Sequence, residues 1–414
     1  MSNNNFLKWF YPGIKVKRWM FASLFGVLVV GIGAVFSVYP HPFVRTFGTV
    51  IILCGVVFIV LGMGKMTVSL LTLFLPQRER DIVNILYQRR YLDRGPKVVT
   101  IGGGHGLSHL LLGLKEYTGN LTAIVTVADS GGSSGRLREE FNIVAPGDIR
   151  NCLVALADAP ALMGQLFQYR FEEGAGLKGH NFGNLFLTAM VQITNGDFQK
   201  AVEESSKVLA IRGKVIPSTI RNVHLVAEYV DGSRTEGEAK IPRRDVAIKK
   251  LYLNPEDAEP TPEALAAIAE ADIIILGPGS LYTSIIPNLI IKGMPDAIAQ
   301  SPAYKIYVCN VMTQPGETDG FNASDHIRVL VDHSNAEVID ACILNNTVAP
   351  EHALNRYLKE HSYPVVADVE RIKNMGYKVV ATDLLGVNDY VRHDSKKLTQ
   401  ILIKLIESQR VIKR

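Results

Sequence analysis

The segment Lys97–Tyr117 reads KVVTIGGGHGLSHLLLGLKEY, and it decides the fold of the chain. Apolar and β-branched residues, typical of a buried strand, run into the glycine cluster Gly102–Gly106, and an apolar helical pattern follows. Similar breaks follow LTAIVTVA at 121–128, ADIIILGPGS at 271–280 and KIYVCNV at 305–311. Strands that alternate with helices predict an α/β fold with a Rossmann-like, doubly wound, mostly parallel sheet that is covered on both faces.

Later parts of the chain extend this pattern and interrupt it once. The runs AEVIDACILNN, YPVVADVE and YKVVATDLL are also expected to form strands. The segment 223–242, VHLVAEYVDGSRTEGEAKIP, predicts instead an antiparallel hairpin with its turn at Asp231–Gly232. We therefore expect a small β insertion within the parallel architecture.

The N-terminal part of the chain has the composition of a membrane hairpin. Residues 19–39 and 47–64 carry no charge, and each run is long enough to cross a bilayer. We expect two transmembrane helices, at about 19–39 and 47–66, and a basic juxtamembrane helix over 77–94. The alternative, a signal peptide followed by a buried helix, is disfavoured because the first run is long and lacks a small-residue cleavage site.

The distribution of charge orients this hairpin. Basic residues precede the first run and follow the second, whereas the connector PHPFVRT at 40–46 carries only Arg45. The positive-inside rule therefore predicts a multi-pass protein of the cytoplasmic membrane, with both termini and the main domain in the cytoplasm. We place the domain boundary between the hairpin at 1–94 and the main domain at 95–414.

The composition of the main domain narrows the classes of partner. Residues 1–94 hold 11 Lys and Arg against 3 Asp and Glu, which leaves 33 against 37 for the rest of the chain. A mildly acidic main domain argues against nucleic acid as a partner. The four cysteines are far apart, so neither a metal cluster nor a disulfide framework is expected.

Candidate binding residues lie where the predicted strands end. The cluster Gly102–Gly106 either cradles a phosphate at a helix N-terminus or forms a plain strand–helix turn. Its spacing is not that of G-x-G-x-x-G, because Leu107 occupies the third glycine position. Asp129 ends the second strand where a ribose-binding acid sits in dinucleotide folds, and Arg136 follows a run of Gly and Ser donors.

Other candidates also have alternatives. Arg392, with His393 and Asp394, is expected to start the C-terminal helix, where it either contacts an anion or is an ordinary surface arginine. Asp148 in APGDIRN is either a ligand-binding acid or a helix-start acid, and His180 in GHNFGN is either a ligand or a structural histidine. The complete set of candidate ligand-binding residues is Gly102, Gly103, Gly104, His105, Gly106, Asp129, Ser130, Gly131, Gly132, Ser133, Ser134, Arg136, Asp148, Asn151, His180, Asn181, Asn184, Gly277, Gly279, Ser280, Asn310 and Arg392. Several strand ends that offer donors and glycine loops favour a phosphate-rich nucleotide as the ligand.

Six motifs occur together in a fixed order: VVTIGGGHGL, TAIVTVADSGGSSGRLR, PGDIRN, GHNFGN, GPGSLYTSIIPNL and CNVMTQPGETDG. From about Lys97 to the C-terminus, the chain resembles the bacterial gluconeogenesis factor family, a UDP-sugar-binding branch of the 2-phospho-L-lactate transferase superfamily. The resemblance implies binding of UDP-N-acetylglucosamine and a role in cell-wall homeostasis and cell shape during growth on gluconeogenic carbon. If the chain resembles the transferase relatives in activity as well, the resemblance implies a different reaction. In that reaction a phospholactyl group is joined to a deazaflavin precursor, Mg²⁺ is used and GMP is released.

The chain departs from that family pattern at two positions. His105 stands where a Thr is common, and Ser130 stands where a second Asp often follows Asp129. Adjacent acids suit Mg²⁺, so the loss of one favours a binding protein over an enzyme. We assign no catalytic residue and no cofactor. In the alternative hypothesis the protein is an enzyme, and Asp129 and Asp148 would be its catalytic residues and would hold Mg²⁺.

The predicted function is a membrane-tethered UDP-sugar sensor or regulator. Its expected partners are the UDP-sugar, the membrane and an unidentified regulated protein of wall metabolism, with self-association left open. Most members of the family branch lack an N-terminal hairpin, so the resemblance implies that the tether is an addition of this chain.

Overall fold

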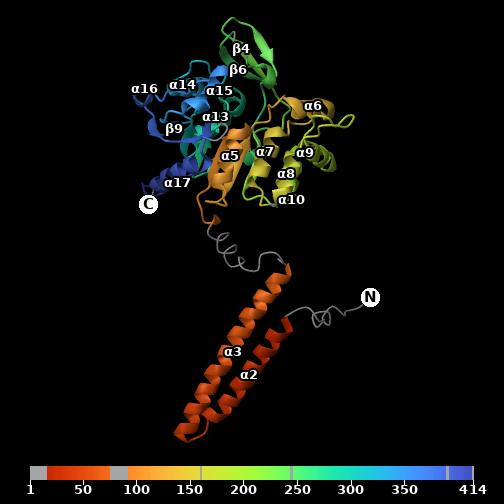
Figure 1. The fold of residues 1–414 in the computed structure, drawn as a ribbon, viewed down its shortest axis with the longest axis vertical. Coiled ribbons are helices and arrows are strands. Elements are labelled where there is room, and N and C mark those ends of the chain that lie inside the picture. The colour runs from red at the N-terminus through yellow and green to blue at the C-terminus, as the bar shows by residue number, and fades with distance from the viewer. Residues whose placement is uncertain (1–15, 75–91, 159–160, 243–245, 388–390, 413–414) are drawn as a thin grey trace. The chain divides into compact units, whose positions relative to one another are not determined.

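The computed structural model describes residues 16–74, 92–158, 161–242, 246–387 and 391–412 (Figure 1). The chain divides into two compact units, Met1–Arg90 and Tyr91–Arg414.

The first unit is a pair of antiparallel helices, α2 (Val16–Ser37) and α3 (Pro42–Phe74). Glycines allow their backbones to approach closely: a Cβ atom on Gly33 would lie 2.8 Å from the carbonyl oxygen of Gly48. The rings of Phe25 and Phe58 pack edge to face, with their centroids 5.8 Å apart. Because the outward residues of both helices are exposed and apolar, this unit carries a hydrophobic exterior.

Both helices are long and apolar enough to be candidate membrane spans, over Arg18–Ser37 and Pro42–Ser69. The helix that carries the predicted second span is longer than that span, because α3 already begins at Pro42, a residue suited to the first turn of a helix. Lys65 does not interrupt α3, and its ammonium lies 5.9 Å from the centre of the Trp19 ring. Most of the predicted basic helix at 77–94 lies outside the described residues, which resume at residue 92.

The second unit is built on a seven-stranded parallel sheet with the strand order β10-β9-β8-β7-β1-β2-β3. The strands are β1 (Val98–Gly102), β2 (Leu121–Val125), β3 (Lys214–Pro217), β7 (Ile273–Leu276), β8 (Tyr304–Val308), β9 (Ala341–Asn345) and β10 (Lys378–Thr382). All five residues of β1 are buried, as a central strand requires. The chain winds from β1 toward β3 and later from β7 toward β10, so the switch in strand order lies between β1 and β7.

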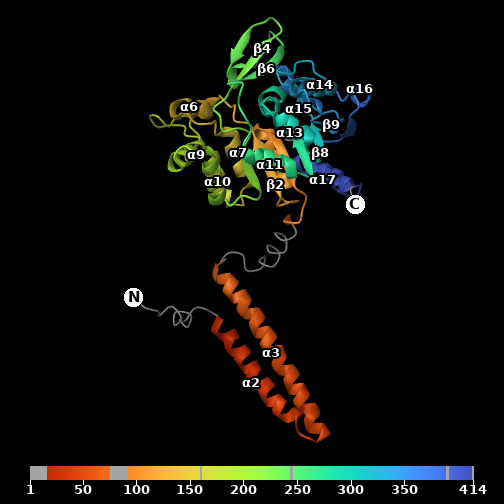
Figure 2. The same ribbon diagram turned by 180° about the vertical axis from the view of Figure 1, so that it is seen from behind.

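Helices cover both faces of this sheet, as the sequence pattern predicts. α5 (Gly104–Leu114), α7 (Gly147–Leu156) and α17 (Ser395–Ile412) lie on one face, and α11 (Pro262–Glu270) and α13 (Met294–Gln300) lie on the other (Figures 1 and 2). The remaining helices are α6 (Gly132–Phe141), α8 (Ala161–Gln168), α9 (Phe182–Ile193), α10 (Phe198–Val208), the π-helix η2 (Leu281–Ile285), α12 (Ile286–Leu289), α14 (Ala323–Ser334), α15 (Glu351–Lys359) and α16 (Val369–Asn374).

The β insertion forms as expected and gains a third strand. β4 (His224–Tyr229) pairs antiparallel with β5 (Arg234–Glu236) around the predicted turn, where Gly232 has a φ of +83°. The additional strand, β6 (Ile248–Asn254), pairs with the other edge of β4. A short 3-10 helix, η1 (Glu238–Lys240), follows β5 directly.

Two local predictions near the C-terminus are wrong. YPVVADVE forms no strand: Pro364 makes only an isolated bridge with Met312, and its ring leaves no N–H for a regular ladder. Arg392 does not start the C-terminal helix but lies in β12 (Val391–His393), which pairs with β11 (Leu385–Val387). α17 begins at Ser395, after Asp394 has accepted the N–H groups of Lys396 and Lys397.

Candidate functional site

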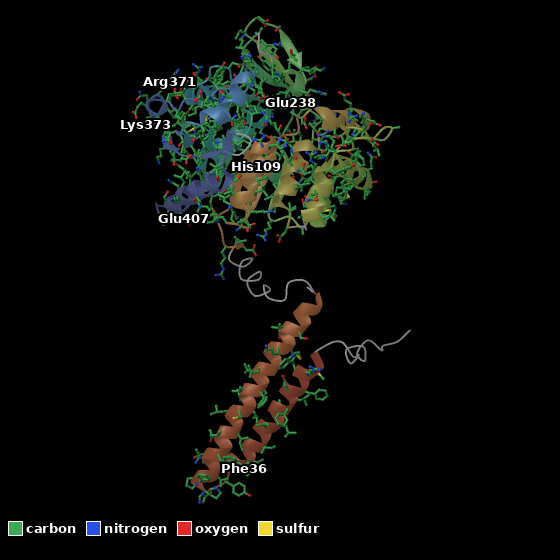
Figure 3. The ribbon with its side chains drawn as sticks, in the orientation of Figure 1. Phe36, His109, Glu238, Arg371, Lys373 and Glu407 are labelled. Atoms are coloured by element: carbon green, nitrogen blue, oxygen red, sulfur yellow. The ribbon has the colours of Figure 1, made fainter. Side chains whose placement is uncertain are left out.

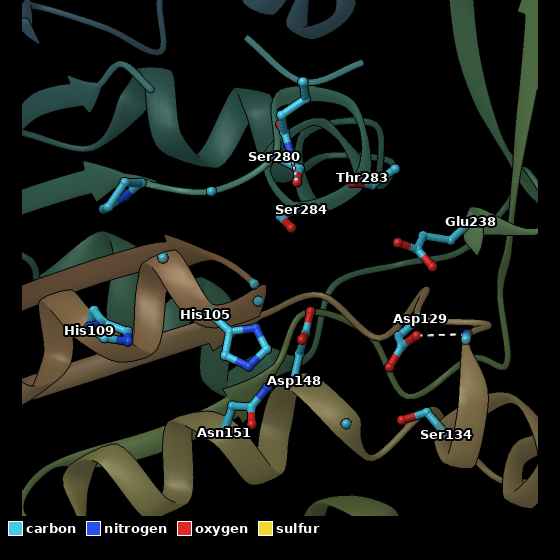
Figure 4. A pocket seen from close by; sticks show the side chains of 18 of the residues that line it. His105, His109, Asp129, Ser134, Asp148, Asn151, Glu238, Ser280, Thr283 and Ser284 are labelled. Atoms are coloured by element: carbon cyan, nitrogen blue, oxygen red, sulfur yellow. Dashed lines mark hydrogen bonds between the residues drawn. The ribbon is translucent and has the colours of Figure 1, made fainter. Parts of the chain in front are cut away.

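A cleft of about 640 Å³ opens at the carboxyl ends of β1, β2, β7 and β8, beside the switch in strand order (Figure 4). This is where open α/β sheets commonly bind ligands. The predicted residues that line it are Gly103, Gly104, His105, Gly106, Asp129, Gly131, Gly132, Ser133, Ser134, Asp148, Asn151, Asn184, Gly279, Ser280, Asn310 and Arg392. Their grouping here follows from the parallel sheet, which brings equivalent strand ends together.

Three predicted residues support the cleft from behind. The hydroxyl of Ser133 accepts the backbone N–H of Asn181 at 3.1 Å and lies 3.3 Å from Nδ1 of His180. Asn181 also caps α9 by accepting the N–H of Asn184. The guanidinium of Arg136 turns away to donate to the carbonyl of Lys178. His180, Asn181 and Arg136 are thus outside the lining of the cleft.

The other three predicted residues that do not line the cleft lie at loop bases. Gly102 ends β1, and its carbonyl accepts the N–H of Thr126 at 2.8 Å. Gly277 follows β7 and donates its N–H to Ile101. The hydroxyl of Ser130 accepts the N–H of Ala239 in the β insertion at 3.0 Å.

The first glycine loop is packed too closely for side chains at two positions. A Cβ atom on Gly103 would lie 2.5 Å from both Asp148 Oδ2 and Thr126 Cγ2. A Cβ atom on Gly106 would lie 2.5 Å from the carbonyl oxygen of Pro278, in the loop after β7. Glycine is therefore needed where the loops after β1 and β7 meet, and the N-terminus of α5 opens toward the cleft.

The second loop of the cleft lies between β2 and α6, at residues 126–131, and Asp129 organises it. Its Oδ1 accepts the N–H of Gly131 at 2.8 Å, which fixes the start of α6 at Gly132 (Figure 4). The next residues, Gly132, Ser133 and Ser134, line the cleft with N–H and hydroxyl groups. The loop therefore presents donors toward the cleft while its own acid is partly engaged.

Asp148 is a helix-start acid whose side chain also faces the cleft. It lies in the first turn of α7, and its carboxylate accepts the N–H of Gly104 while facing the cleft. Burial, and then the charge of Asp129, raise the pKa of Asp148 to about 7. The carboxyl group of Asp148 therefore changes its protonation state near neutral pH.

Arg150, which the sequence did not single out, organises the floor of the cleft. Its guanidinium donates to Asn184 Oδ1 at 2.9 Å and to Asn151 Oδ1 at 2.7 Å, and Asn184 in turn donates to Ser134. Burial lowers the pKa of Arg150 to about 10, so the side chain stays charged at neutral pH. This network joins α6, α7 and α9 beneath the ligand space.

One side of the cleft is rich in basic side chains. His105 and His109 lie one turn apart on α5, and Arg392 is close enough to lower the pKa of both, after the larger effect of burial (Figure 4). His393 beside them lies 3.1 Å from the carbonyl of Cys309, and burial lowers its pKa to about 4. His393 is therefore neutral at physiological pH, and the positive charge comes from Arg392.

Twelve lining residues were not among the candidates: His109, Gly147, Arg150, Arg170, Glu238, Pro278, Thr283, Ser284, Val311, Met312, Gln314 and His393. His109 could have been found, because it lies four residues after His105 on the predicted helix. Glu238 carried no local signal, since it belongs to the β insertion.

The acidic side chains of the cleft determine whether it can bind a metal ion. Among the described residues, no group of three or more His, Cys, Asp and Glu side chains is arranged to hold a metal ion. Mg²⁺ needs only one or two carboxylates when ligand phosphates and waters complete its shell. Asp129 and Asp148 are the pair that would meet this requirement, and each already accepts one backbone N–H.

Comparison with known proteins agrees with the fold. The family model of 2-phospho-L-lactate transferase CofD matches residues 98–385. The gluconeogenesis factor of Bacillus subtilis is 48% identical over 76% of this chain and 100% of its own length. A crystal structure of a UPF0052 family member from Bacillus halodurans is 46% identical, with a TM-score of 0.72 over 75% of this chain and 99% of that chain.

The comparisons also correct one expectation about the N-terminal hairpin. A relative from Nostoc sp. is 47% identical over 97% of this chain and 92% of its own length, so its similarity extends through the hairpin. The hairpin is therefore shared with some relatives and is not an addition of this chain alone. On these matches, the chain belongs to the 2-phospho-L-lactate transferase CofD family, among the gluconeogenesis factors.

Proposed function

We propose that this protein binds a UDP-sugar, UDP-N-acetylglucosamine in particular, and regulates cell-wall metabolism and cell shape during growth on gluconeogenic carbon. The observation that carries the proposal is the division of charge in the cleft. Arg392 and the start of α5 lie with His105 and His109, Asp129 and Glu238 lie on the other side, and Asp148 lies between them (Figure 4).

A diphosphate suits the first side and a nucleoside or sugar suits the second. Backbone N–H groups at the starts of α5 and α6 favour anions, and a guanidinium adds a charge-assisted contact. Carboxylates accept hydrogen bonds from ribose, sugar and base donors. The hydrogen bonds of Arg150 to Asn151 and Asn184 form the floor of the cleft between its basic and acidic sides.

Calorimetry on the full-length chain in detergent micelles tests this proposal directly. UDP-N-acetylglucosamine should give saturable heat, and Arg392→Gln should weaken binding about tenfold, since a hydrogen bond to a charged group is lost. Arg328→Gln is the matched control, because Arg328 pairs with Asp325 on the exposed side of α14. Absence of heat at millimolar ligand would overturn the proposal.

The second candidate is a Mg²⁺-dependent enzyme of the 2-phospho-L-lactate transferase type. The observation that favours it is that Asp129 and Asp148 line the same cleft and that the charge of Asp129 raises the pKa of Asp148, an effect that a bound cation would offset. In this reading the two acids would hold Mg²⁺ against the phosphates of a nucleotide-activated substrate. Mg²⁺-dependent nucleotide release that is lost in Asp148→Asn would support it, and binding indifferent to Mg²⁺ without turnover would exclude it.

We further propose that α2 and α3 cross the cytoplasmic membrane and leave both termini inside. Their apolar exteriors and the scarcity of basic residues between them support this topology. Alkaline phosphatase fused after Tyr39 should be active outside the membrane, and the same fusion after Arg414 should be inactive. The reverse pattern would show that the topology is inverted.

The membrane tether would keep the sensor beside a regulated protein of wall synthesis. Light scattering tests whether the protein associates with itself.

A further inference from the structure

The β insertion reaches the cleft through a single short helix, η1. Its first residue, Glu238, is labelled in Figure 3, and its carboxylate points into the cleft toward Asp129 (Figure 4). Both ends of η1 are anchored to β4: the N–H of Gly237 donates to Leu225 at 2.9 Å, and the hydroxyl of Tyr229 donates to the carbonyl of Ile241 at 2.7 Å. Since Tyr229 is fully buried, the position of Glu238 is set by the core of the insertion.

Ser130 ties η1 to the second loop of the cleft in two directions. Its backbone N–H donates to the carboxylate of Glu238. Its hydroxyl accepts the N–H of Ala239 at 3.0 Å. One residue that lies behind the cleft therefore holds both the side chain of Glu238 and the backbone that carries it. An Asp at position 130 would instead bring a further negative charge against Asp129 and Glu238.

The surroundings of Glu238 are unfavourable to its charge. Burial raises its pKa to about 7, followed by the charge of Asp129, and Glu317 adds to the shift. The two charged groups that shift it are thus both acids, and the N–H of Ser130 is the donor that offsets them. A carboxylate held in this way gains most from a ligand that supplies another hydrogen-bond donor.

We propose that Glu238 is a specificity-determining residue of the cleft, positioned by Ser130, and that its carboxylate accepts a hydrogen bond from an uncharged N–H or O–H group of the ligand. The inference rests on the proposed function, because it takes the ligand to be a nucleotide sugar. In such a ligand the base, the ribose and the sugar carry uncharged donors, and the diphosphate carries the charge. Glu238 would select for a donor at its position, whereas the glycine loops would hold the phosphates.

Calorimetric titration of the full-length chain with UDP-N-acetylglucosamine and with UDP tests the assignment. Glu238→Gln and Glu238→Ala should each weaken UDP-N-acetylglucosamine about tenfold, the effect of losing a hydrogen bond to a charged group. An equal loss for UDP would place the donor on the nucleoside, and a loss confined to UDP-N-acetylglucosamine would place it on the sugar. Glu236→Gln is the matched control, since this neighbouring acid is exposed and accepts from Asn254.

Ser130 is tested through the same ligands. Ser130→Ala removes the acceptor for the N–H of Ala239 and should weaken ligand binding several-fold. Ser130→Asp adds a negative charge and should weaken binding further. Ser130→Thr keeps the hydroxyl and should bind the ligand as the unaltered chain does. In Ser130→Ala and Ser130→Asp, the losses of affinity for UDP-N-acetylglucosamine and for UDP should stand in the same proportion as in Glu238→Gln. A purely structural role would lower the unfolding temperature and leave the affinity of the folded chain for both ligands unchanged.

The failures of the two proposals are distinguishable. If the unaltered chain binds neither ligand, the proposed function fails. If it binds them and both Glu238 variants bind with unchanged affinity, the assignment of Glu238 is overturned while the proposed function stands.

Discussion

Asp148 occupies the space that a side chain at position 103 would need, because a Cβ atom on Gly103 would lie 2.5 Å from Asp148 Oδ2. The first glycine loop and the start of α7 are separated by 45 positions in the sequence and meet at this contact. The same carboxylate accepts the N–H of Gly104. The shape of the loop after β1 and the placement of the acid are therefore one structural feature.

Gly103→Ala should accordingly disturb the cleft. The added methyl group has to displace Asp148 or Thr126, so ligand affinity should fall at least tenfold and stability should drop by about 1–3 kcal/mol. Gly102→Ala is the matched control, because its nearest neighbours would be 3.8 Å away. Calorimetry and chemical denaturation of both variants check the result, and equal behaviour of the two would refute the steric argument.

Asp148→Asn should stabilise the protein, and more so at higher pH. The folded-state pKa of Asp148, about 7, lies above the ordinary value of 3.8. Between these values the unfolded chain loses the proton that the folded protein keeps, so stability falls as the pH rises from about 4 to about 7. Asn avoids this loss and still accepts the N–H of Gly104.

The expected gain for Asp148→Asn is about 1–3 kcal/mol at pH 8 and close to zero at pH 4. Thermal unfolding at both pH values measures it. Asp296→Asn serves as the control, since Asp296 is an exposed acid in the first turn of α13. A gain that did not grow with pH would contradict the burial of a shifted carboxyl at position 148.

Gly113→Ala should destabilise the packing of α17 on α5. A Cβ atom there would overlap the hydroxyl of Thr399, and the expected cost is about 1–3 kcal/mol. Adding Thr399→Ala removes that hydroxyl and should restore part of the loss. A double-mutant cycle in urea measures the coupling. Gly164→Ala in α8 is the control and should leave the free energy of unfolding unchanged, because nothing lies within 4 Å of a Cβ atom there. Additive effects of the substitutions at 113 and 399 would rule out the contact.

Gly33→Val should separate α2 from α3, whereas Gly31→Val should not. A Cβ atom on Gly33 would lie 2.8 Å from the backbone of α3, but nothing lies within 4 Å of one on Gly31. Oxidative cross-linking of Phe25→Cys with Phe58→Cys, in a Cys54→Ser background, reports the helix pairing. The efficiency should fall only with Gly33→Val, and an equal effect of both variants would indicate a loss of helix propensity instead.

The sequence predicted the class of the fold well, because the evidence for it is local. Each strand of the parallel sheet is a short apolar run that ends in a glycine or polar break, and this pattern is visible at β1, β2, β7 and β8. YPVVADVE shows the limit of that evidence. Its apolar residues resemble those of a strand, yet Pro364 contributes only an isolated bridge.

The candidate site was predicted in part, for the same reason. Residues in the loops that follow strands, such as Gly103 after β1 and Asp129 after β2, could be identified because the ends of parallel strands converge. Arg150 and Glu238 could not. Arg150 lies within a helix and acts through Asn184, and Glu238 is carried to the cleft by an insertion whose own pattern says nothing about the parallel sheet.

The sequence by itself determined two apolar helices, an alternation of strands and helices, and the glycine loops at the strand ends, because hydrophobic periodicity and backbone freedom are properties of neighbouring residues. Only the tertiary structure decided which acids share the cleft, how burial and mutual charge raise the pKa values of Asp148 and Glu238 to about 7, and that Ser130 holds η1 in place. These features depend on distances between segments that are remote in the chain, and packing alone sets those distances.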